Sequence, residues 1–129
     1  MTLLQFGNMV CSNLIATELT PDYRQLSMDR IAALNEILTN SPNDAFARYG
    51  LAMEYSKQGD FDRALAEFSI LLEKNPDYTA GYFMAAQTLA RAERMDEAKT
   101  MLTNGIAAAR RTGNLHAQSE MEAMLGDLS

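Results

Sequence analysis

The side chains of this sequence best suited to catalysis or metal binding include one histidine and one cysteine, which stand far apart. His116 has no second histidine, no nearby cysteine and no nucleophile at a fixed spacing, so neither a zinc site nor a catalytic triad can be assembled around it. Cys11 is the only cysteine, which excludes a disulfide within one chain. The glycines never cluster as a phosphate-binding loop requires. We therefore predict no catalytic residue, no metal and no cofactor.

Carboxylates occur at the expected starts of helices. Asp60, Asp62, Asp96 and Glu97 stand where an acidic side chain accepts hydrogen bonds from free backbone N–H groups and complements the helix dipole. That structural role accounts for them without acid–base catalysis. An enzyme is therefore the third of the function classes that we consider.

The composition narrows the class of protein further. The 129 residues include eleven Lys plus Arg and seventeen Asp plus Glu, which gives a net charge of −6. This surplus repels nucleic acid, and no local basic stripe offsets it. No apolar run of 18 residues is present, so no membrane span is expected. We expect a soluble, cytoplasmic, single-domain protein with no nucleic-acid or membrane partner.

The chain repeats itself every 34 residues. Pro42 falls on Pro76 when the sequence is shifted by this period. Six further pairs of similar residues coincide in the same register: Leu34 with Phe68, Leu38 with Leu72, Ala52 with Ala86, Phe61 with Met95, Asp62 with Asp96, and Ala64 with Ala98. The repeat predicts that one structural unit occurs at least twice.

Apolar spacing near 3.6 residues predicts two helices in each period. They are expected over 44–58, from 61 to the Asn75-Pro76 stop, over 78–92 and over 95–112. Gly59-Asp60 and Glu93-Arg94 separate the members of each pair, and Gly113 closes the last. Two further helices, over 29–40 and 114–127, make six helices with no strand.

The two flanking helices are expected to complete the stack. The helix over 29–40 is in register with a second helix, so it forms half a repeat, and the last helix covers the final apolar face with Leu115, Met121, Met124, Leu125 and Leu128. The domain plan is then an extension over 1–27, half a repeat over 28–42, repeats over 45–78 and 79–112, and a capping helix over 113–129.

This spacing resembles the tetratricopeptide repeat family over about residues 29–129. The first full repeat matches the family signature at Leu51-Ala52, Tyr55, Gly59, Ala64, Phe68 and Pro76, and the second at Tyr82, Ala85-Ala86, Leu89, Ala98 and Leu102. Arg48 departs from it where a bulky aromatic is common, and Arg110 where proline is common, so we expect the last long helix to continue by a turn. The resemblance implies an all-α, right-handed α-solenoid of antiparallel helix pairs. Small residues are expected where helices cross closely: Ala52, Ala64, Ala86, Ala98 and Gly105.

The first helices carry apolar side chains on a face that the core does not use. By resemblance to the family, this face lines a concave groove that binds a peptide segment or helix of a partner protein. The predicted groove residues are Phe46, Tyr49, Met53, Lys57, Phe83, Met84, Gln87 and Arg91. Aromatic and methionine side chains would supply contact area, while Lys57, Gln87 and Arg91 would fix register or an acidic end of the peptide. The Lys and Asn clamp that some family members use for chaperone tails is absent.

Two readings of this face stay open. It binds a partner protein, or it is covered by the first 27 residues, the last helix or a second copy of the chain. If a second copy of the chain covers this face, the protein is a structural assembly protein that forms a homodimer.

Residues 1–27 do not follow the repeat register. Leu3, Phe6, Val10 and Leu14 have helical spacing, but no Lys or Arg precedes them and no cleavage site follows, so the segment is a poor signal peptide. The residues before Cys11 argue against a lipidated cysteine. A functional N-terminal helix, and a tail or misplaced start upstream of Met28, are the two remaining hypotheses.

Overall fold

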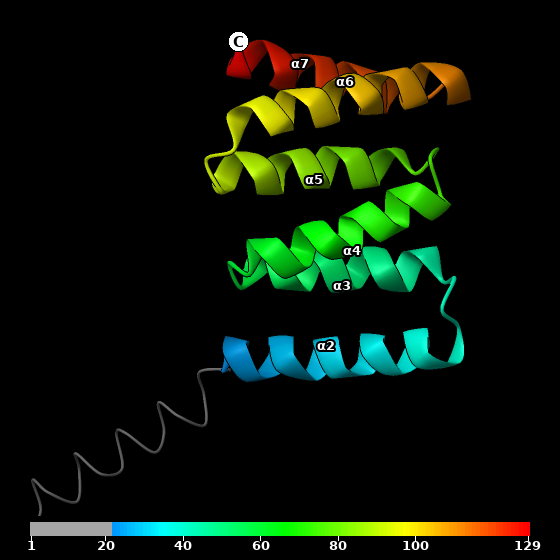
Figure 1. Ribbon diagram of the computed structural model, residues 1–129, viewed down its shortest axis with the longest axis vertical. Coiled ribbons are helices and arrows are strands. Elements are labelled where there is room, and N and C mark those ends of the chain that lie inside the picture. Colours follow the sequence, from blue (N-terminus) through cyan, green and yellow to red (C-terminus); the bar gives the residue numbers. More distant parts are fainter. Residues whose placement is uncertain (1–21) are drawn as a thin grey trace, which may run out of the picture.

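The structure is a computed structural model that describes residues 22–129 as a single stack of antiparallel helices (Figure 1). The helices are α2 (Tyr23–Asn40), α3 (Ala45–Lys57), α4 (Phe61–Lys74), α5 (Thr79–Arg91), α6 (Met95–Thr112) and α7 (Leu115–Leu128). This part of the chain contains no strand, which confirms the predicted all-α solenoid. The N-terminal helix expected around Leu3–Leu14 lies outside the described residues.

Short polar residues cap the starts of several helices, and residues with positive φ lie in the turns after α3, α5 and α6. Asp44 accepts a hydrogen bond from the Ala47 N–H at 2.9 Å, and Asp60 and Asn114 cap α4 and α7 in the same way. The turns after α3 and α6 place Gly59 and Gly113 at φ of 79° and 70°. Glu93 takes the equivalent conformation, with φ of 61°, at the turn after α5. The predicted turns are therefore confirmed.

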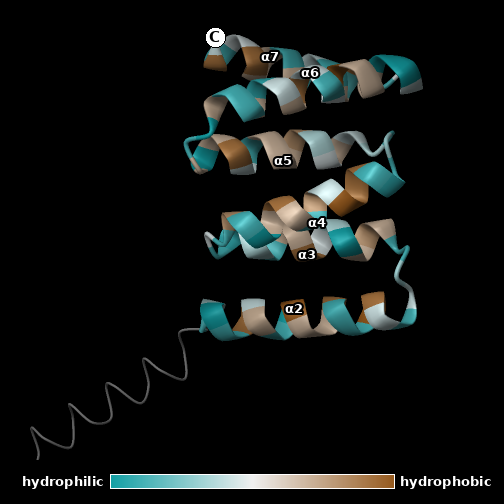
Figure 2. Ribbon diagram, in the orientation of Figure 1, coloured by the Kyte–Doolittle hydropathy of each residue, from teal (hydrophilic) through white to brown (hydrophobic). Residues whose placement is uncertain are grey.

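The core is divided into three clusters along the stack. One lies between α2 and α3, one among α3, α4 and α5, and one among α5, α6 and α7. The small residues expected at the crossings, Ala52, Ala64, Ala86 and Ala98, have no exposed surface. Hydrophobic and hydrophilic residues alternate along every helix, because each helix buries only part of its surface (Figure 2).

Two expectations about the flanking helices were wrong. The helix α2 begins at Tyr23 rather than at residue 29, because Asp22 caps it by accepting hydrogen bonds from Arg24 and Gln25. Ser27 is buried and donates a hydrogen bond of 2.9 Å to Glu54, so the expected boundary between 27 and 28 falls inside this helix. Leu115 does not cover the core, since it lies at the first turn of α7 and is 75% exposed.

Candidate partner-binding face

The first helices of the repeats lie side by side along one face of the stack. The helix α5 contacts both α3 and α7, and the second helices α4 and α6 do not contact one another. We call the surface shared by α3, α5 and α7 the inner face. All eight residues that the sequence predicted for a groove belong to two of these helices, α3 and α5.

The aromatic and methionine residues of the inner face differ in burial. Phe46 is 78% exposed, whereas Met53 is half-buried against the central core cluster. Tyr49 lies with its ring centroid 5.4 Å from that of Tyr78 and 6.4 Å from that of Phe68. Burial raises the pKa of the Tyr49 phenol above its ordinary value of 10.0, and nearby Tyr78 adds to the increase. The Tyr49 ring is therefore uncharged at neutral pH.

Three of the predicted residues come together in a pocket. Tyr49 from α3 and Phe83 and Met84 from α5 line a cavity of about 210 Å³, which we call the inner pocket. Thr79, Ala80, Asn114, His116, Ala117 and Glu120 complete its lining. The pocket thus has an apolar wall on α3 and α5 and a more polar wall on α7.

The predicted polar residues lie outside the inner pocket, at the other end of the inner face. Lys57 places its Nζ 3.6 Å from Glu54 Oε1 and stays 59% exposed. Arg91 donates a hydrogen bond of 3.2 Å to Ser56 Oγ and stacks 5.3 Å from the Phe61 ring centroid. Both cations already have intramolecular partners and still reach solvent. Gln87 is half-buried beside them along α5.

Sequence reasoning missed the contribution of α7 to the inner face. His116 and Glu120 line the inner pocket, with His116 Nε2 3.2 Å from Glu120 Oε1. The prediction gave the last helix as a cap and as one possible cover of this face, but it named no residue of that helix for the groove. The start of the last helix is the signal that could have identified these residues. The helix α7 begins 36 residues after α5, so His116 occupies the position that Ala80 has in α5.

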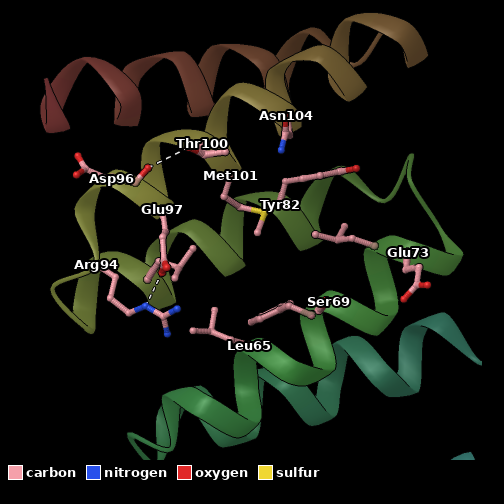
Figure 3. A pocket seen from close by; sticks show the side chains of 13 residues that line it. Leu65, Ser69, Glu73, Tyr82, Arg94, Asp96, Glu97, Thr100, Met101 and Asn104 are labelled. Atoms are coloured by element: carbon pink, nitrogen blue, oxygen red, sulfur yellow. Dashed lines mark hydrogen bonds and ion pairs between the residues drawn. The ribbon is translucent and has the colours of Figure 1, made fainter.

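A second pocket, which the sequence did not indicate, lies on the opposite side of the stack. This outer pocket has a volume of about 630 Å³ and lies between α4 and α6, with α5 as its floor (Figure 3). Leu65, Leu72, Leu89 and Met101 are among its apolar lining residues. Arg94 and Glu97 form an ion pair at its edge, and the hydrogen bond from Arg94 lowers the pKa of Glu97.

The remaining chemical features of residues 22–129 are few. They contain no group of three His, Cys, Asp or Glu side chains arranged to hold a metal ion. None of the helices described here has both the length and the apolar character needed to cross a bilayer.

Comparisons with known proteins agree with this architecture. The tetratricopeptide repeat model matches residues 49–99. A TPR repeat-containing protein of Pseudomonas aeruginosa is 29% identical over 98 residues, which cover 76% of this chain and 93% of the relative. The solution structure of a tetratricopeptide repeat domain protein from Salinibacter ruber is 35% identical, with a TM-score of 0.65, over 68% of this chain and 89% of that one.

A more distant solved structure shares the fold. The TPR2B domain of yeast Sti1, solved as a complex with pHsp70, has a TM-score of 0.74 at 18% identity over 82% of this chain and 85% of that one. Pairs of antiparallel helices, stacked with a 34-residue period, define a helical repeat protein. This chain belongs to the tetratricopeptide repeat family. The family and the fold are those of protein–protein interaction modules, which are typically not catalytic.

Proposed function

We propose that this protein binds a peptide segment or helix of a partner protein on its inner face. The observation that carries the proposal is the inner pocket, where Tyr49, Phe83 and Met84 meet on the same face as the exposed Phe46. Tyr49, Phe83 and Met84 also pack against the core clusters, but each is only partly buried and contributes apolar surface to the pocket. Exposed apolar surface of this kind is characteristic of interaction sites. The complex of the yeast Sti1 domain with pHsp70 supports the proposal, because that protein has the same fold.

The size of the inner pocket sets what it accepts. Sites for cofactors and other small molecules usually enclose about 300–1,000 Å³. The inner pocket, at about 210 Å³, is smaller and suits one apolar side chain that projects from a peptide. Its apolar wall consists of two aromatic rings and a methionine, and the flexible methionine side chain adapts to different apolar shapes. We therefore expect the partner to present a single large apolar residue as an anchor.

The charged end of the inner face indicates a second feature of the partner. Lys57 and Arg91 lie at the C-terminal ends of α3 and α5, whereas Phe83 lies one turn into α5. Eight residues of helix separate Phe83 from Arg91, a distance of about 12 Å. An extended peptide covers that distance in about four residues. The favoured ligand therefore has an acidic residue about four positions from its apolar anchor if it binds in extended form.

A displayed library of random peptides tests this proposal with the full chain as bait. We expect the selected peptides to share a large apolar residue and an acidic residue at this spacing. Titration of a selected peptide into isotope-labelled protein should move the amide signals of Tyr49, Phe83 and Met84. Peptides that instead move signals around Leu65 and Met101 would assign binding to the outer pocket and overturn the proposal.

Matched variants separate binding from folding. Phe46→Ala and Phe83→Ala should each weaken peptide binding about tenfold or more, which corresponds to about 1.4 kcal/mol. Met95→Ala is the control, because Met95 is also an exposed apolar residue, at 42%, but lies at the start of α6. Circular dichroism checks that each variant is folded. If sedimentation shows a dimer that Phe46→Ala dissociates, the inner face is an assembly surface instead.

A further inference from the structure

A row of exposed side chains on α2 has the spacing of a helix–helix contact. Tyr23, Leu26, Arg30, Ala33 and Ile37 recur at intervals of three and four residues, and we call them the α2 stripe. Tyr23, Leu26 and Ile37 are 74%, 43% and 44% exposed. Among the described helices, α2 contacts only α3, mainly through another side that includes Leu34 and Leu38. Within the stripe, Arg30 also pairs with Glu54 of α3 at 3.5 Å. Three large apolar residues are therefore exposed on one side of a single helix.

Comparison of α2 with α4 and α6 in the 34-residue register indicates which neighbouring helix the α2 stripe lacks. Ile37 corresponds to Leu71 in α4 and to Gly105 in α6, and both of those residues are buried. Gly105 faces Tyr82 on α5, the first helix of its own repeat, and Met121 on α7, the helix that follows. For α2 the helix that follows is α3, which is present. The corresponding place beside α2 belongs to the first helix of a repeat, and no helix within residues 22–129 occupies it.

We propose that residues 3–15 of this chain form that helix and pack on the α2 stripe. Residues 16–22 connect this segment to the start of α2, so the segment can reach the stripe. The helix α2 has 18 residues and is about 27 Å long, and residues 3–15 as a helix would cover about 20 Å of it. A segment attached at this point has a high effective concentration at the stripe.

The sequence of the segment is complementary to the α2 stripe. Most of its large apolar residues and its cysteine fall on one side of a helix: Leu3, Leu4, Val10, Cys11, Leu14 and Ile15. Phe6 falls at the edge of this side, and Met9 falls opposite it. The polar residues Gln5 and Ser12 fall on the other side. Glu18 is the only charged residue among the first 21 residues, so no positive charge is brought against Arg30. A second copy of α2 on the stripe would instead bring two Arg30 side chains onto the same surface.

The single cysteine allows a direct test in the full chain. In a Cys11→Ser, Ser12→Cys background, a nitroxide spin label attached at residue 12 lies on the polar side of the proposed helix. We expect the amide signals of Leu26, Ala33 and Ile37 to lose intensity, while those of Leu102 and Met121 keep theirs. Loss at Tyr49 and Phe83 would mean that the segment covers the inner face, and no loss in any helix would mean that it packs nowhere. Either result overturns the proposal.

Two controls complete the experiment. A mixture of isotope-labelled protein with unlabelled, spin-labelled protein reports contacts between copies. Intensity loss in that mixture would assign the contact to a second molecule and overturn the proposal. Ile37→Asp should abolish the loss on α2, since it places a charge in the stripe. Met95→Asp, at a residue with nearly the same exposure, should preserve it. Equal effects of both substitutions would overturn the proposal.

Discussion

Arg48 and Tyr82 occupy the same position in successive repeats and make the same hydrogen bond. Arg48 Nη2 donates to the carbonyl oxygen of Pro42 at 3.1 Å, and Tyr82 Oη donates to that of Pro76 at 2.8 Å. Arg48 also pairs with Glu67 at 2.6 Å, which compensates the charge in a partly buried site. The departure from the family signature at Arg48 therefore preserves the contact between the first helix and the preceding turn.

Among the glycines that the structure describes, Gly105 has the least space around it for a side chain. A Cβ atom there would lie 2.6 Å from Tyr82 Cβ and 2.5 Å from Met121 Sδ. We predict that Gly105→Ala destabilises the protein by about 1–3 kcal/mol, because Tyr82 Cβ is fixed to the α5 backbone and the Met121 side chain is fully buried, so neither has much room to move. Urea unfolding measures this change.

Gly126→Ala is the matched control for that substitution. Nothing lies within 4 Å of a Cβ atom at Gly126, so alanine there should leave stability unchanged or raise it by up to about 1 kcal/mol. If Gly105→Ala is as stable as Gly126→Ala, the close contact between α5 and α6 is wrong.

The residue types predicted part of the candidate site. All eight predicted residues lie on the helices α3 and α5. The sequence could predict this because a 3.6-residue period of apolar residues marks both a helix and its core side. Which of them line the inner pocket was not predictable, since that depends on where α7 sits. The helix α6 has 18 residues whereas α4 has 14, as Arg110 in place of proline suggested, and this longer helix shifts α7 out of the 34-residue register.

At the scale of helices, α7 completes the last core cluster. Met121 has no exposed surface and packs against Leu102, Ile106 and Ala109, with Met124, Leu125 and Leu128 around it. We predict that removal of residues 114–129 lowers the free energy of unfolding by about 3 kcal/mol or more and promotes association, because this apolar surface becomes exposed. Thermal unfolding and sedimentation measure the two effects.

Leu115→Ala is the control for the α7 deletion. Leu115 lies on the same helix but is 75% exposed, so its truncation should change stability by less than about 0.5 kcal/mol. A truncated chain that stays monomeric with an unchanged melting temperature would contradict the capping role of α7.

Most helix boundaries followed from the sequence, and the exception has a physical cause. Gly59, Asp60 and Gly113 mark ends that backbone geometry requires, so they were visible without a structure. The start of α2 was missed because the residues from Tyr23 to Met28 lack a continuous apolar stripe. Its first turns are held instead by Asp22 as a cap and by the hydrogen bond from Ser27 to Glu54, a contact between residues 27 positions apart.

At the scale of the whole molecule, contacts join helices that are neighbours in the stack. The helices α4 and α5 are packed on both sides, whereas α7 lies at one end of the described stack. In such an array, stability is the sum of contributions from each unit and each interface. We predict that amide hydrogens of α4 and α5, such as Phe68 and Ala85, exchange most slowly, and that those of α7 exchange faster. Native-state hydrogen exchange measures this, and uniform protection from α2 to α7 would contradict it.

The hydrogen bonds between neighbouring helices of the inner face differ in their exposure to water. Between α3 and α5, Ser56 and Thr88 share a buried hydrogen bond of 2.9 Å, and Arg91 adds a second contact to Ser56. Between α5 and α7, the hydrogen bond from Asn114 to Thr79 is exposed to water, which competes for it. We therefore expect the angle between α5 and α7 to change more easily than the angle between α3 and α5. In the proposed complex, a side chain seated in the inner pocket would contact both α5 and α7, so we expect its binding to change the angle between these two helices.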